Sequence, residues 1–142
     1  MTREEDLAME LIPAVPTAKG PAETFVGDVY VDPIKEAAEP SRLNVSAVRF
    51  TPGARTNWHS HAVGQTLHVT DGSGLVVNRD GTVIRLRPGD TVWTPPGEEH
   101  WHGATADRLM CHLAMFEGTE SSNGTTWLEP VSDAEYEAAQ RT

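Results

Sequence analysis

The hydrophobic positions of this chain follow the spacing of β-strands rather than that of helices. From Lys19 to Arg55, short apolar runs alternate with proline, glycine and aspartate, and no helical repeat persists. The apolar run from Leu43 to Phe50 ends just before Pro52-Gly53, where proline fixes φ and glycine permits a positive φ. The pattern therefore predicts strands that are joined by tight turns.

Turn signals recur at short intervals through the middle of the chain. Apolar runs and the turns between them alternate at residues 75–79, 80–81, 82–86, 88–90 and 91–93. Asp80-Gly81 between two valine-containing runs is typical of a β-hairpin. Several short strands with regular turns and no intervening helices predict an all-β antiparallel sandwich or barrel.

The two ends of the chain differ from this middle. Residues 1–20 carry Glu, Ala, Pro and Lys with weak periodicity, which predicts a flexible N-terminal arm. Ser132 and Glu135 stand at capping-box spacing and precede good helix formers, which predicts a short C-terminal helix packed on the barrel. We therefore expect an arm at 1–20, a barrel at 21–130 and a terminal helix at 131–142.

Size and charge exclude several classes of function. The chain has 142 residues, a usual length for one domain. It carries 11 Lys and Arg against 21 Asp and Glu, and the net charge of −10 repels nucleic-acid phosphates and anionic lipid surfaces. The acidic start lacks the apolar segment of a signal peptide, and no stretch approaches a membrane span. With Cys111 as its single cysteine, we expect a cytoplasmic protein with neither nucleic-acid nor membrane partners.

All six histidines lie between residues 59 and 112, and four of them form two His-x-His pairs, His59 with His61 and His100 with His102. Successive side chains of a strand point to opposite faces, so each pair directs two imidazoles to one face. On a helix the same spacing separates two side chains by about 200° of rotation. Because neutral imidazole is the commonest protein ligand of transition metals, the pattern predicts one metal ion inside a sheet.

Two longer motifs contain these pairs. The first reads Gly-Ala-Arg-Thr-Asn-Trp-His-Ser-His-Ala-Val-Gly-Gln at residues 53–65 and is followed by Gly72; the second reads Gly-Asp-Thr-Val-Trp-Thr-Pro-Pro-Gly-Glu-Glu-His at 89–100. Their order and spacing resemble the signature motifs of the cupin family over roughly residues 45–117. The resemblance implies a single-domain double-stranded β-helix, or jelly-roll barrel, with one divalent metal ion in its mouth. It also implies four metal ligands, which are His59, His61, Gln65 and His100.

A closer resemblance is to the small bacterial cupins that act as manganese-dependent hydroxynitrile lyases on mandelonitrile-like substrates. It rests on phrases such as Trp-His-Ser-His at 58–61, Gly-Gln-Thr-Leu at 64–67 and His-Trp-His-Gly-Ala at 100–104. It implies reversible cleavage of a cyanohydrin to an aldehyde or ketone and hydrogen cyanide, with His102 and His112 as catalytic residues that face the metal. The expected ion is manganese, and iron, zinc, nickel and cobalt are alternatives, because imidazole and amide groups suit several of these metals.

Gln65 departs from the general cupin pattern, which usually has glutamate at this position. Three imidazoles and one amide leave the full charge of a divalent ion uncancelled, which favours Lewis acidity and the binding of an anion. The missing carboxylate also argues against the oxygen chemistry of iron sites that contain one. Two alternatives remain, an oxygen-dependent cupin oxidoreductase acting on a small phenol or diketone, and a non-catalytic cupin that binds a small molecule.

The remaining histidine, the cysteine and three of the tryptophans are expected to have structural rather than catalytic roles. His68 has the parity opposite to Gln65, so its side chain should turn away from the metal toward a surface or interface. Cys111 alternates away from His112 and is expected to be a small buried hydrophobe. Three tryptophans are expected to pack in the barrel or at an interface: Trp58, Trp93 and Trp101. The cupin resemblance also implies a homodimer or homotetramer.

Overall fold

Thirteen strands and one helix follow one another along residues 8–142, the part of the chain that the computed structural model describes. The elements are β1 (Ala18–Lys19), β2 (Phe25–Val26), β3 (Val29–Lys35), β4 (Leu43–Phe50), β5 (Arg55–Thr56), β6 (His59–His61), β7 (Gln65–Gly72), β8 (Gly74–Asn78), β9 (Val83–Leu86), β10 (Thr91–Thr94), β11 (His100–Ala104), β12 (Met110–Glu117), β13 (Thr125–Trp127) and α1 (Asp133–Gln140). Residues 1–7 of the expected arm lie outside the described residues.

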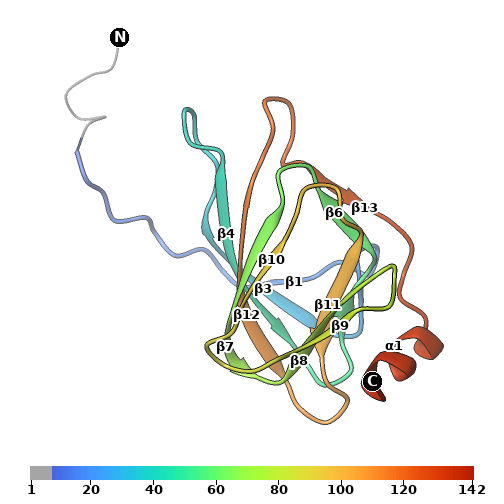
Figure 1. The fold of residues 1–142 in the computed structure, drawn as a ribbon. Helices are drawn as coiled ribbons and strands as arrows, with labels where there is room; N and C mark the ends of the chain where they lie inside the picture. Colours follow the sequence, from blue (N-terminus) through green and yellow to red (C-terminus); the bar gives the residue numbers. More distant parts are fainter. Residues whose placement is uncertain (1–7) are drawn as a thin grey trace.

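The strands form two antiparallel sheets that curl into the walls of a barrel (Figure 1). The first sheet has the order β1-β3-β4-β12-β7-β10, and the second has the order β13-β6-β11-β5-β2, with β8 paired to β11 and β9 paired to β8. Because β12 lies between β4 and β7, strands far apart in sequence are neighbours, as in a jelly roll. The predicted all-β jelly-roll barrel with a short terminal helix is confirmed.

The apolar interior follows from the alternation of inward and outward residues along most of the central strands. β7 and β12 alternate buried and partly exposed residues, because successive side chains of a strand point to opposite faces. Leu67, Val69, Met110 and Ala114 therefore pack in the interior cluster. Gln65 has the parity of Leu67, and His112 has the parity of Ala114, so both polar side chains point inward with these apolar neighbours.

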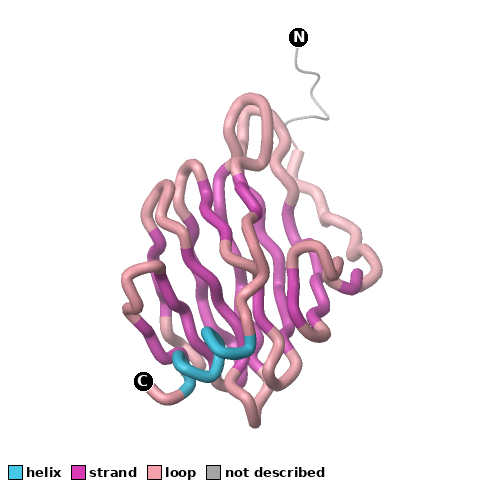
Figure 2. Tube along the Cα trace, turned by 90° about the vertical axis from the view of Figure 1, so that its right-hand side faces the viewer, coloured by secondary structure: helices cyan, strands magenta, loops and turns pink. Residues whose placement is uncertain are grey.

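A second apolar cluster lies outside the barrel, between the second sheet and α1. It contains Trp58, Leu75, Val77, Trp101, Val131, Tyr136 and Ala139. Figure 2 shows α1 lying across the strands near one end of the barrel. The helix begins after Ser132, whose side chain accepts the Glu135 amide while the Glu135 carboxylate accepts the Ser132 amide, which is the predicted capping box. The Tyr136 hydroxyl donates to the Ala104 carbonyl at 2.7 Å and ties the helix to β11.

The described part of the N-terminal segment reaches the barrel at β1. Ala18 and Lys19 pair with Val31 and Tyr30 at the edge of the first sheet. The chain before them runs away from the barrel without regular secondary structure (Figure 1). Within residues 8–142, no helix has the length and apolar character that crossing a membrane requires.

Candidate metal centre

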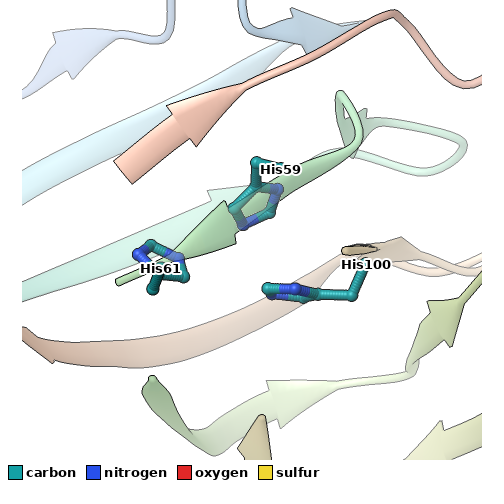
Figure 3. Close-up of side chains that lie close together, drawn as sticks. All are labelled: His59, His61 and His100. Carbon is teal, nitrogen blue, oxygen red and sulfur yellow. The ribbon is translucent and has the colours of Figure 1, made fainter. Parts of the chain in front are cut away.

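Three histidine side chains from two neighbouring strands meet inside the barrel. His59 and His61 come from β6 and His100 comes from β11, where it stands directly opposite His59 (Figure 3). Their exposed fractions are 1%, 4% and 1%. One ring nitrogen of each lies within 4.8 Å of the others, a spacing that one ion can bridge with small movements of the side chains.

The second ring nitrogens show which nitrogens are free for a metal. Nδ1 of His59 is 2.9 Å from the Asn57 carbonyl oxygen, and Nδ1 of His100 is 3.0 Å from the Glu98 carbonyl oxygen. A carbonyl only accepts, so both Nδ1 atoms carry the hydrogen and both Nε2 atoms keep a lone pair. Nε2 of His61 is buried and has no hydrogen-bond partner within residues 8–142. Two lone pairs are thereby left for a cation, and Nε2 of His61 is a third ring nitrogen without a partner beside them.

Gln65, at the start of β7, is the fourth candidate metal ligand. The turn before it needs Gly64, which has φ of 85° and where a Cβ would lie 2.9 Å from the Thr94 carbonyl oxygen. Gln65 Oε1 is 3.2 Å from Nε2 of His100. Because the His100 hydrogen is on Nδ1, these two atoms are both acceptors, and a cation shared between them would satisfy both. The donor set thus fits the metal ion that the sequence predicts.

A second pair of histidines lies beside this set. His102 on β11 and His112 on β12 approach at 3.0 Å between Nδ1 and Nε2, and only 4% and 1% of their surfaces are exposed. The His102 ring centre is 5.2 Å from that of His59. The outer nitrogens of the pair, Nε2 of His102 and Nδ1 of His112, are buried without a partner in the described part of the chain. One hydrogen shared between two imidazoles leaves the pair able to take up and return a proton.

Burial keeps these imidazoles neutral. Desolvation, with a smaller contribution from His100, lowers the pKa of His59 well below 6.5 and that of His61 to about 4. Desolvation also lowers the pKa of His100 and His112, the latter to about 4, and desolvation with the adjacent His112 lowers that of His102. Neutral imidazole is the form that binds metals and the form that acts as a base.

A cavity of about 170 Å³ opens beside the histidines. Its lining combines polar and apolar side chains. The polar residues are Ser46, Thr56, His59, His61, Gln65, His102, His112, Asn123 and Thr125. The apolar residues are Phe25, Val31, Val48, Ala114, Phe116 and Trp127. No Asp or Glu belongs to the lining as far as residues 8–142 are concerned, so no carboxylate offsets the charge of an ion there.

Comparisons with known proteins agree with this architecture. The cupin domain family matches residues 46–116. A protein from Granulicella tundricola named (R)-mandelonitrile lyase is 45% identical over 120 residues, which cover 84% of this chain and 91% of that protein. This chain belongs to the cupin family.

Other cupins resemble the chain in structure or in part of the sequence. The crystal structure of a cupin-like protein from Thermotoga maritima has a TM-score of 0.81 and 34% identity, and the match covers 92% of this chain and 97% of that chain. An acireductone dioxygenase from Rhodopseudomonas palustris is 35% identical over 57 residues, which cover 38% of this chain and 34% of that protein. The dioxygenase match therefore covers less than half of either chain.

The other candidate residues of this cupin lie outside the cavity. His68 is partly exposed, and its Nδ1 is 2.8 Å from the Thr91 hydroxyl on the outer face of the first sheet, so the predicted direction is correct. Trp58 and Trp101 are buried under α1, whereas Trp93 is 59% exposed. The expectation of a small buried hydrophobe at Cys111 is wrong, because the residue lies on the outer face of β12 and is partly exposed. Desolvation raises the pKa of its thiol, which disfavours a nucleophilic role.

Several side chains of the site lie outside both sequence motifs. Phe25 and Trp127 contact each other with ring centres 5.9 Å apart, and Trp127 lies 4.6 Å from the His59 ring. Thr125 is 3.1 Å from Nδ1 of His61. These residues belong to strands of two and three residues, which are too short for the alternation that indicates an inward direction in longer strands. Sequence reasoning accordingly had no signal for them.

Proposed function

We propose that this cupin is a metal-dependent lyase that reversibly cleaves cyanohydrins to an aldehyde or ketone and hydrogen cyanide. The observation that carries the proposal is the meeting of a neutral metal-ligand set with a separate pair of hydrogen-bonded histidines in one small cavity. The 45% identical relative named (R)-mandelonitrile lyase supports the same chemistry.

The ligand set would hold one divalent ion, which we propose to be manganese. Its donor atoms would be Nε2 of His59, His61 and His100 and Oε1 of Gln65. When bound, the ion supplies Lewis acidity that stabilises negative charge on a substrate oxygen or on cyanide. All four donors are neutral, so the full positive charge stays available to an anion.

His102 and His112 carry out the proton transfers of the proposed reaction. Cleavage requires that the cyanohydrin hydroxyl loses its proton, that the bond to cyanide breaks with its electron pair on cyanide, and that a carbonyl forms. The two neutral imidazoles accept the hydroxyl proton and return it to cyanide, which leaves as hydrogen cyanide, and no oxidant is consumed. Their burial keeps both in the basic form at neutral pH.

The size and the walls of the cavity favour a small substrate with an apolar group. A volume of about 170 Å³ admits a single-ring aryl group or a short alkyl group beside the reacting carbon. The rings of Phe25, Phe116 and Trp127 form the apolar wall on which such a group would pack. The same wall limits the access of water to the reacting groups.

A direct assay tests the proposal. Protein purified without metal and reconstituted with manganese should release benzaldehyde from mandelonitrile faster than buffer with manganese alone. The reaction should run at the same rate without oxygen, because a lyase consumes none. A metal-loaded protein that releases no benzaldehyde above buffer would contradict the proposal.

Two outcomes of related assays favour the alternatives. Oxygen uptake with a small phenol or diketone, together with loss of turnover in anaerobic solution, would indicate a cupin oxidoreductase. Metal-loaded protein that binds a carbonyl compound and turns over no cyanohydrin or phenol would indicate a binding protein. A His68→Ala variant serves as the control in every assay, because His68 lies on the outer face of the barrel.

A further inference from the structure

One wall of the metal site comes from β13, which lies beyond the residues that match the cupin domain. β13 pairs with β6 in antiparallel register, with Thr125 opposite His61, Thr126 opposite Ser60 and Trp127 opposite His59. Directly opposed residues of antiparallel strands point to the same face, and neighbours along a strand alternate. Thr125 therefore lies beside a ligand histidine inside the barrel, and Thr126 is exposed on the other face.

His61 differs from the two other ligand histidines in what its Nδ1 meets. Main-chain carbonyls accept from Nδ1 of His59 and His100, and a carbonyl permits only one tautomer. Nδ1 of His61 instead lies 3.1 Å from the Thr125 hydroxyl, which is able to accept or to donate. The direction of this one hydrogen bond decides whether Nε2 of His61 carries a lone pair or a hydrogen.

The main chain around Thr125 holds its hydroxyl in place. The Thr125 amide donates to the Asn123 side-chain oxygen at 3.0 Å, and the Ala62 amide donates to the Gly124 carbonyl at 2.8 Å. The Trp127 ring then lies 4.6 Å from the His59 ring, which limits the movement of a second ligand from the same strand. Such outer contacts fix the orientation and the tautomer of metal-binding histidines.

We propose that Thr125 is a positioning residue for the metal centre. Its hydroxyl accepts the Nδ1 hydrogen of His61 and so holds the tautomer whose Nε2 lone pair faces the other ligands. The inference rests on the proposed metal site and extends it, because it assigns the orientation of one ligand to a strand outside the family motifs.

Metal affinity tests this role through three variants. Thr125→Val keeps the shape of the side chain and removes the hydroxyl, Thr125→Ser restores the hydroxyl, and Thr126→Val is the matched control on the exposed face. In competition with a chelator, Mn²⁺ and Co²⁺ should bind to Thr125→Val about 10- to 100-fold more weakly than to the wild type. Thr125→Ser and Thr126→Val should retain the wild-type affinity. Wild-type affinity in Thr125→Val would overturn the proposal.

A second measurement needs neither a variant of Thr125 nor a metal. Long-range proton–nitrogen spectra of metal-free, ¹⁵N-histidine-labelled wild-type protein report the tautomer of each ring, with His61 assigned by the signal that His61→Asn lacks. His61 should carry its hydrogen on Nδ1, and a hydrogen on Nε2 would overturn the inference. A wild-type protein that binds no metal would overturn the proposed function, while the tautomer measurement would still judge the role of Thr125.

Discussion

Five histidines of the same chemical type suit the different tasks proposed for them because their ring nitrogens have different partners. His59 and His100 donate to main-chain carbonyls, His61 meets a hydroxyl, and His102 and His112 meet each other. The first three are thereby left with a nitrogen for a metal, and the last two with a shared hydrogen. The role proposed for each histidine therefore depends more on the partner of its ring nitrogens than on its position in the sequence.

Removal of His112 should separate metal binding from turnover. His112 is not among the donor atoms, so His112→Ala should keep one ion per chain in elemental analysis. Loss of an imidazole that handles protons typically lowers turnover by about 10²- to 10⁴-fold, and we expect kcat to fall within that range. Full turnover in His112→Ala would remove this residue from the mechanism.

Substitution of Gln65 by glutamate should raise the affinity for the metal and lower the affinity of the bound metal for anions. A carboxylate cancels one unit of the charge of the ion, so Gln65→Glu should bind Mn²⁺ roughly tenfold more tightly. The same change should weaken inhibition by cyanide and lower kcat, because the ion attracts anions less strongly. Chelator competition and cyanide inhibition curves measure the two effects. Unchanged cyanide affinity would contradict the role assigned to the neutral ligand.

Among the elements, β11 joins the site to the C-terminal helix. His100 and His102 point into the barrel from this strand, whereas Trp101 between them packs under α1 with Tyr136. Alternation along one strand thus places metal-site residues on one face and a helix contact on the other. The helix packs against the outer face of the strand that carries His100 and His102, and it contributes no residue to the cavity.

Loss of the helix cap should affect stability more than chemistry. Ser132→Ala removes the side chain that accepts the Glu135 amide, which should lower the free energy of unfolding by about 1 kcal/mol in urea titrations. Turnover should stay near the wild-type value, because α1 contributes no residue to the cavity. Ser121→Ala in an exposed loop is the control and should leave stability unchanged. Equal stability of both variants would contradict the structural role of the cap.

The longer elements were predictable from sequence and the shortest were not. The run from Leu43 to Phe50 is β4, and the turn at residues 80–81 joins β8 to β9 as a hairpin. Residues 125–127 carry no such signal, because three residues show no persistent alternation and their direction depends on pairing with β6. The boundaries expected for the arm, the barrel and the terminal segment stay predictions.

At the scale of the whole molecule, buried neutral histidines should make the metal-free protein sensitive to acid. Folding lowers the pKa of His61 and His112 from 6.5 to about 4, so between these values the unfolded chain binds more protons than the folded one. Stability that is present above pH 6.5 is therefore lost as the pH falls toward 4. Each of the two groups contributes roughly 3 kcal/mol over that range.

Urea unfolding of the metal-free protein at two pH values checks this expectation. The free energy of unfolding should be smaller at about pH 5 than at about pH 7 by 2 kcal/mol or more, given about 1.4 kcal/mol for each pKa unit. His112→Leu should show a shallower dependence on pH, because one titrating group is removed. Equal stability of the wild type at both pH values would contradict the neutral state of these histidines.

The outer face of the first sheet should bring two copies of the chain together. Val45 and Ala47 on β4 lie opposite Met115 and Leu113 on β12, and all four are partly exposed on the face that points away from the interior. The net charge of −10 opposes association elsewhere, whereas these four residues are uncharged and the neighbouring Arg49 and Asp32 pair with each other at 3.2 Å. We expect a dimer in sedimentation and a monomer for Leu113→Asp, with Ile84→Asp as the control. A monomeric wild type would contradict this expectation.

The sequence by itself determined the class of fold and indicated the histidines that could hold a metal ion. Strand alternation, turn residues and the two His-x-His pairs act over a few neighbouring residues, so their consequences are readable in the chain. Only the tertiary structure decided that His100 stands opposite His59, that His102 meets His112, and that Thr125 lies beside His61. These contacts depend on the register between strands far apart in sequence, and that register is set when the two sheets close around one core.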